Sequence, residues 1–144
     1  MQQSTAIFWP VIVQVALIYA VYYLLFTRRQ LAVKAGRARL SQFRDNVTEP
    51  EETRFLKNNL TNQYELPVLF IAGCIANYVT GHAGIVAVLL AWLFVALRIV
   101  HTVIHVGQNR LRYRVPVFIA GYAVNGLLWL WLAANIAWRA LAGG

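Results

Sequence analysis

Four polar side chains share an otherwise apolar run over residues 85–106: Arg98, His101, Thr102 and His105. Their i, i+3, i+4, i+7 spacing places them on one face of a helix. Guanidinium and imidazole groups bind anions, transfer protons and ligate metals. Inside a membrane such ionisable residues cost about 2.5–3.5 kcal/mol each, so they normally face a helix interface or a polar cavity. This helical face is the first candidate site.

A second polar face lies in the stretch over residues 58–65, just before the apolar run over 66–79. Asn62 and Glu65 are three residues apart and therefore point in one direction from a helix. The predicted partner of Glu65 is Arg98, because in an ion pair each charge offsets the desolvation of the other. Such a pair either lines a polar pocket or only fixes the register of two helices. We predict that Glu65 and Arg98 meet across adjacent helices.

His101 and His105 are four residues apart, a spacing that directs two imidazoles toward one point. They are either polar contacts between helices or ligands of a metal ion or haem. No second carboxylate–histidine pair completes a ligand set, and the nearest carboxylate, Glu65, is already assigned to Arg98. We therefore predict no metal site.

A compact basic turn follows residue 107 and contains Arg110, Arg112 and Arg114. Attraction to anionic lipid headgroups explains these residues without any specific site. Alternatively, a guanidinium in a crevice between helices holds a carboxylate or stabilises a thiolate. The single cysteine, Cys74, lies in an apolar run and has no basic neighbour in sequence. Thiol chemistry would therefore need a bound thiol.

Four apolar runs must position these groups. With 60% hydrophobic and 12% charged residues, the 144-residue chain lacks the composition of a water-soluble domain. A membrane span needs about 20 apolar residues, so the run over 66–79 spans only if the polar stretch 58–65 extends its helix. We predict an all-α integral membrane four-helix bundle, a single domain over 1–144, with a cytoplasmic loop over 28–57 and helices at about 6–27, 58–79, 85–106 and 115–138.

The distribution of basic residues predicts the orientation. The net charge is +8, and most Lys and Arg residues lie in the loop over 28–57 or in the basic turn. The positive-inside rule places both of these loops in the cytoplasm and both termini outside. Membrane lipid, rather than nucleic acid, is the partner that this arrangement favours.

Two motifs resemble those of the MAPEG superfamily, small membrane proteins with four helices that include microsomal glutathione transferases, leukotriene C4 synthase and microsomal prostaglandin E synthase. The motifs are Asn62-Gln63-Tyr64-Glu65-Leu66-Pro67 and the segment with Arg98, His101, His105 and Gly107, followed by Arg110 and Arg114. The resemblance covers most of the chain. It implies a homotrimer that binds glutathione between neighbouring subunits near the cytoplasmic side and receives a lipophilic small-molecule substrate from the bilayer.

The resemblance also implies roles by position. Asn62 and Glu65 would contact the backbone amide and amino group of glutathione. Arg98 would lie at the glutathione end of the crevice, with His101 and His105 as further glutathione-binding candidates on the same face. These five residues are the core of the expected cosubstrate site.

Arg114 corresponds to the family's arginine near the thiol, and Arg112 competes for this role because the length of the turn varies within the family. The expected function is a glutathione-dependent transferase or peroxidase acting on a lipophilic electrophile. The alternative is a non-catalytic membrane subunit or lipid-binding scaffold, alone or inside a larger membrane complex.

The chain departs from the family pattern at several positions. Asn58 stands where glutathione transferases of the family often have arginine, with Arg54 and Lys57 nearby as imperfect substitutes. Val115 and Phe118 lack the hydroxyl that synthases often carry.

His105 stands where members that synthesise eicosanoids commonly have tyrosine. This residue makes the chain more similar to a bacterial branch of the superfamily with unassigned substrates. We therefore expect the protein in a bacterial inner membrane.

Overall fold

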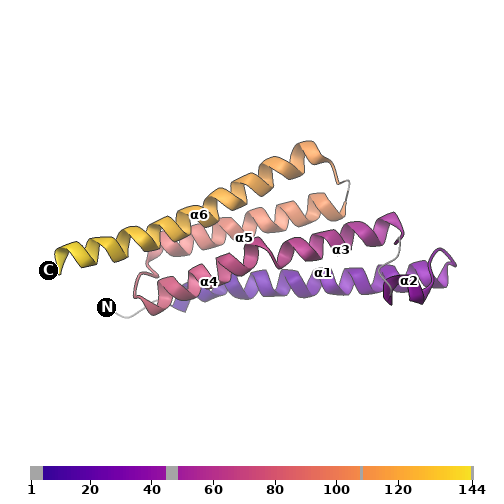
Figure 1. Ribbon diagram of the computed structural model, residues 1–144, viewed down its shortest axis with the longest axis horizontal. Coiled ribbons are helices and arrows are strands. Elements are labelled where there is room, and N and C mark those ends of the chain that lie inside the picture. Colours follow the sequence, from indigo (N-terminus) through magenta and orange to yellow (C-terminus); the bar gives the residue numbers. More distant parts are fainter. Residues whose placement is uncertain (1–4, 45–48, 108, 144) are drawn as a thin grey trace.

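The protein consists of helices that run alongside one another (Figure 1). The computed structural model describes residues 5–44, 49–107 and 109–143, and all regular secondary structure within them is helical. The predicted all-α class is confirmed. In chain order the helices are η1 (Thr5–Ile7), α1 (Phe8–Lys34), α2 (Leu40–Arg44), α3 (Glu51–Gln63), α4 (Leu66–Val79), α5 (Ile85–Val106) and α6 (Leu111–Ala142).

Three helical segments are long and apolar enough to cross a membrane: Thr5–Lys34, Ile85–Val106 and Leu111–Ala142. They contain the expected helices at 6–27, 85–106 and 115–138, but α1 continues to Lys34 and α6 begins at Leu111. Large apolar side chains remain exposed along them, as lipid-facing residues do. The chain is an integral membrane protein by these criteria.

The helix expected over 58–79 is interrupted, so that prediction is wrong. α3 ends at Gln63, and the 14-residue α4 begins at Leu66. Pro67 lies in the first turn of α4, where it offers no N–H to the carbonyl of Gln63 and its ring would clash with that carbonyl in a continuous helix. The two-residue break between α3 and α4 follows.

The stretch expected as a loop over 28–57 contains the end of α1, all of α2 and the start of α3. Glu49, whose side chain is buried, joins α1 and α3. Arg29 Nη2 lies 2.6 Å from Glu49 Oε1, and Lys57 Nζ lies 3.5 Å from the same oxygen. This ion-pair cluster ties the start of α3 to α1.

The two halves of α5 pack differently. Its N-terminal half packs apolar residues against α4, where Phe94 stacks on Phe70 with ring centroids 4.3 Å apart. From Arg98 onward its buried side chains are polar. Because α3 lies beside this C-terminal half (Figure 1), the polar faces of α3 and α5 meet.

Candidate functional site

A buried network of hydrogen bonds joins α1, α3 and α5, with Gln63 at its centre. Gln63 Oε1 accepts a hydrogen bond from Gln14 Nε2 at 2.9 Å. Gln63 Nε2 donates to Thr102 Oγ1 at 2.9 Å and to Asn59 Oδ1 at 3.3 Å. Asn59 Nδ2 lies 3.2 Å from His105 Nδ1. These five buried residues are called the polar seam below.

The polar seam sets the proton position on His105. An amide nitrogen only donates, so the contact from Asn59 makes Nδ1 of His105 the acceptor. Asn59 is held in this orientation because its oxygen accepts from Gln63. A neutral His105 therefore carries its hydrogen on Nε2, the ring atom left for other partners.

Arg98 caps the C-terminal end of α3. The residue is only 1% exposed, and its Nη2 donates to the backbone carbonyl oxygen of Asn62 at 2.9 Å. The last carbonyls of a helix lack intrahelical donors and carry partial negative charge. At the Pro67 break this charge lies inside the protein, so a buried guanidinium has a backbone partner there.

The predicted Glu65–Arg98 ion pair is therefore wrong within this chain. Among the side chains that the structure describes, no carboxylate oxygen lies within 4 Å of Arg98. Glu65 sits in the break between α3 and α4 with φ −92° and ψ −92°, and its side chain is exposed. The break turns Glu65 outward, and Arg98 takes the α3 carboxyl end instead.

Several buried donors and acceptors beside the polar seam have no hydrogen-bond partner among the described residues. They include Nε and Nη1 of Arg98 and Nδ1 of His101. The His101 ring lies between those of His105 and Phe118, with centroids 5.6 and 5.7 Å away. Buried polar atoms are normally hydrogen-bonded, so the remaining N–H groups of Arg98 have the capacity to donate to an additional acceptor, such as a carboxylate or carbonyl.

A cavity of about 280 Å³ lies beside the polar seam, between α3 and the start of α6. The guanidinium of Arg114 is anchored there because Nη1 donates to Asn109 Oδ1 at 2.5 Å. Asn109 has φ 47°, a left-handed conformation that asparagine tolerates. The residues lining the cavity, called the Arg114 cavity below, are Asn58, Thr61, Asn62, His105 and Arg114. Three predicted site residues, Asn62, His105 and Arg114, are thus brought together.

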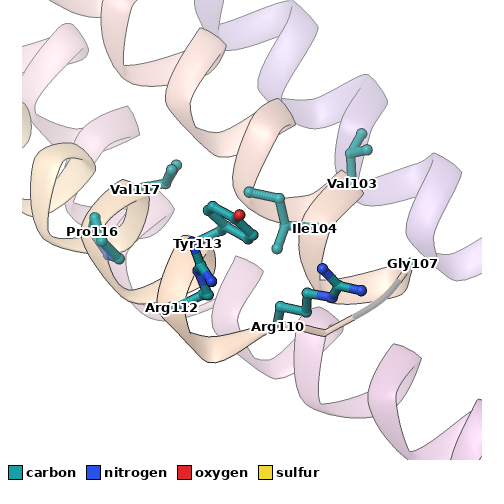
Figure 2. Close-up of a pocket in the computed structure, with 8 residues that line it drawn as sticks. All are labelled: Val103, Ile104, Gly107, Arg110, Arg112, Tyr113, Pro116 and Val117. Atoms are coloured by element: carbon teal, nitrogen blue, oxygen red, sulfur yellow. The ribbon is translucent and has the colours of Figure 1, made fainter.

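Arg112 lies on the other side of the same turn. Two residues correspond to about 200° around a helix, so Arg112 and Arg114 leave α6 in nearly opposite directions. Figure 2 shows Arg112 beside Tyr113 in a separate cavity of about 580 Å³. Its guanidinium carbon lies 4.7 Å from the centroid of the Tyr113 ring. Of these two cavities, the one lined by Asn62 and His105 is also lined by Arg114 and not by Arg112.

The two basic residues named as substitutes for the family arginine lie elsewhere. Arg54 is exposed, with its guanidinium carbon 6.0 Å from the centroid of the Phe55 ring. Lys57 pairs with Glu49 and lines a cavity between α1 and α3. Neither residue lines the Arg114 cavity. Asn58, which stands at the sequence position of the family arginine, lines it instead.

Within the described residues, no group of three or more His, Cys, Asp or Glu side chains is placed to hold a metal ion. Cys74 is fully buried in the apolar core around Phe70. Val115 is exposed, and Phe118 packs against His101, so these two positions offer no hydroxyl to the site.

Sequence reasoning missed three members of the polar seam: Gln14, Asn59 and Gln63. Gln14 is a lone amide in an uncharged apolar run. Asn59 and Gln63 are four residues apart, which places both on one helical face. Buried amides need partners, so this combination was the available signal.

Comparison with protein families shows to which family the chain belongs. A family model for the MAPEG family matches residues 6–134. The chain belongs to the MAPEG family. No curated protein and no solved structure matches it significantly. In this MAPEG protein the matched range includes the whole polar seam and the Arg114 cavity.

Proposed function

We propose that this MAPEG protein is a membrane-embedded, glutathione-dependent transferase or peroxidase that acts on a lipophilic electrophile. The observation that supports it is the convergence of Arg114, His105 and Asn62 on one cavity, behind which Arg98 donates to the backbone carbonyl oxygen of Asn62. Arg114 supplies a cation, His105 a donor with a fixed tautomer, and Arg98 a buried cation behind the cavity. This set suits a ligand that carries a thiolate and carboxylates.

In this proposal Arg114 stabilises the glutathione thiolate, and Asn109 holds its guanidinium in place. Nε2–H of His105 supplies a second donor, because Asn59 occupies Nδ1. In transfer, sulfur donates an electron pair to the electrophilic carbon and the leaving group departs with the bonding pair. With a hydroperoxide, the thiolate sulfur attacks the terminal oxygen, the O–O bond breaks, and the alkoxide takes a proton from water and leaves as the alcohol. The resulting glutathione sulfenic acid then reacts with a second glutathione to give glutathione disulfide and water. A preorganised donor of this kind typically accounts for about 10²–10³ in rate.

The remaining contacts follow the same geometry. Asn62 lines the cavity and offers its side chain to the ligand's peptide portion. Arg98 and His101 are buried and are not lining residues of this cavity; Arg98 supports it through the backbone carbonyl oxygen of Asn62. At about 280 Å³ the Arg114 cavity is small for a tripeptide, because ligand sites usually measure about 300–1,000 Å³. A homotrimer in which a neighbouring subunit completes the site accounts for this size. The exposed Glu65 is then available to the ligand or to the neighbour.

We extend the proposal to the arrangement in the membrane. The subunit spans four times, with α3 and α4 together forming the second span, in a bacterial inner membrane. The first loop and the basic turn face the cytoplasm, because they carry most of the positive charge.

A second candidate function is a non-catalytic subunit or lipid-binding scaffold. Val115, Phe118 and Asn58 favour it, since the site lacks a hydroxyl and the arginine that glutathione transferases of the family often have. Calorimetric titration of the detergent-purified protein with glutathione separates the two functions. Saturable heat supports the transferase, whereas its absence at millimolar glutathione supports the scaffold.

Two comparisons sharpen this titration. The analogue γ-Glu-Ala-Gly lacks the thiol and should bind more weakly than glutathione if Arg114 contacts sulfur. The variant Arg114→Ala should abolish that preference. Arg39→Ala removes an exposed arginine of the first loop and is the matched control.

A further inference from the structure

The charges of the two halves of the chain are unbalanced. All five acidic residues lie between positions 45 and 65, so residues 66–144 contain arginine but no carboxylate. In the part of the chain that the structure describes, no carboxylate lies within 4 Å of Arg110 or Arg112. An anion for these two guanidinium groups must therefore come from outside the subunit's own helical pair α5–α6.

Arg110 and Arg112 line the same cavity of about 580 Å³ between α5 and α6, called the outer groove below. Figure 2 shows them at the turn, with the apolar side chains of Ile104 and Val117 farther along the helices. Val103, another lining residue, is 67% exposed, so the groove continues into the apolar outer surface of α5. Two cations thus stand at one end of an open apolar channel.

We propose that the outer groove binds one anionic phospholipid from the cytoplasmic leaflet. The phosphate would lie between the guanidinium groups of Arg110 and Arg112, and an acyl chain would run along Val103, Ile104 and Val117. Arginine suits phosphate because its planar N–H groups bind two oxygens at once. Stacking on Tyr113 restrains the Arg112 guanidinium, which lowers the entropy lost on binding.

A free phosphate ion fits these observations less well. It would use the two cations but make no contact with the apolar length of the groove. A phospholipid satisfies both parts of the groove with one molecule, and its chain lies where α5 and α6 meet the bilayer.

Native mass spectrometry of the detergent-purified protein tests the proposal in the absence of glutathione. The probes are phosphatidylglycerol and phosphatidylcholine with identical acyl chains, and inorganic phosphate as a competitor. We expect one phosphatidylglycerol to bind per subunit with preference over phosphatidylcholine. The double variant Arg110→Gln/Arg112→Gln should lose roughly tenfold or more in phosphatidylglycerol affinity, as expected for two cations at a membrane surface.

Two further variants locate the site. Arg39→Gln removes an exposed charge from the first loop and should leave the lipid preference intact. Val103→Trp fills the apolar end and should weaken long-chain phosphatidylglycerol more than a short-chain form. Equal binding of the two lipids, an unaffected double variant, or displacement of the lipid by inorganic phosphate would each overturn the proposal. The outcome is independent of glutathione binding, so it is distinguishable from failure of the proposed transferase activity.

Discussion

Arg112 and Arg114 are two residues apart on the first turn of α6, yet they line different cavities. The Arg114 cavity has polar walls and adjoins the polar seam, whereas the outer groove is mainly apolar and continues to the exposed Val103 on α5. The difference arises from helical geometry, since about 200° separates side chains at i and i+2. One basic turn can therefore serve two ligands of different chemistry.

The largest expected effect comes from removing Arg114. Arg114→Ala should lower kcat/KM for glutathione transfer to a lipophilic electrophile by about 10²–10³, because the thiolate loses its preorganised cation. Arg112→Ala should lower it far less. Steady-state kinetics in detergent, with size-exclusion chromatography to check the oligomer, make the comparison. A larger loss in the Arg112 variant would reverse the assignment of the two cavities.

The next effect concerns stability and the centre of the polar seam. Gln63→Leu removes three side-chain hydrogen bonds. Buried polar groups of Gln14 on α1, Asn59 on α3 and Thr102 on α5 each lose the hydrogen bond that Gln63 made with them. We expect a loss of about 1–3 kcal/mol in the free energy of unfolding. Gln30→Leu alters an exposed glutamine of α1 and serves as control. Reversible unfolding in mixed detergent measures both, and equal changes would mean that the polar seam contributes no stability.

A smaller effect is expected for the residue that orients His105. Asn59→Leu removes the donor to Nδ1, so a neutral His105 ring is free to carry its hydrogen on either nitrogen. ¹⁵N NMR of histidine-labelled protein distinguishes the two tautomers directly. We expect a single Nε2–H form in the unmodified protein and a mixture in the variant. A pure Nδ1–H form in the unmodified protein would show that the polar seam donates in the opposite direction.

The smallest effect should follow from Glu65→Gln. The carboxylate is exposed and has no ion pair within 4 Å among the described side chains, so the free energy of unfolding should change by no more than about 0.5 kcal/mol. The same unfolding assay measures it. A loss of several kcal/mol would restore the buried Glu65–Arg98 pair.

Hydropathy predicted three of the helices because a run of about 20 consecutive apolar residues is typical of a membrane-spanning helix. The all-helical class followed from hydropathy and MAPEG membership from the two motifs, and both are confirmed. The break before α4 was open to prediction from Pro67, because a proline inside a helix removes a backbone hydrogen bond and kinks or breaks the helix. The expected extension of one helix over 58–79 gave that proline too little weight.

The candidate site was only partly predictable. Asn62, His105 and Arg114 came from motif order and do line one cavity. The partner of Arg98 could not be predicted from motif order. A helix C-terminus competes with a carboxylate for a buried guanidinium, and the spacing of side chains in the sequence takes no account of backbone acceptors. The separation of Arg112 from Arg114 also required knowing that α6 begins at Leu111 rather than at 115, because two residues inside a helix at i and i+2 point about 200° apart, whereas residues in a loop have no such fixed relation.

The central claim is that the Arg114 cavity holds glutathione as its thiolate. Ultraviolet difference absorbance of the complex at neutral pH measures thiolate directly, in the unmodified protein and in Arg114→Ala and Arg112→Ala. We predict a thiolate band in the unmodified protein and in Arg112→Ala, and its loss in Arg114→Ala. A complex that keeps glutathione as the thiol, or a band that disappears only in Arg112→Ala, would contradict the claim.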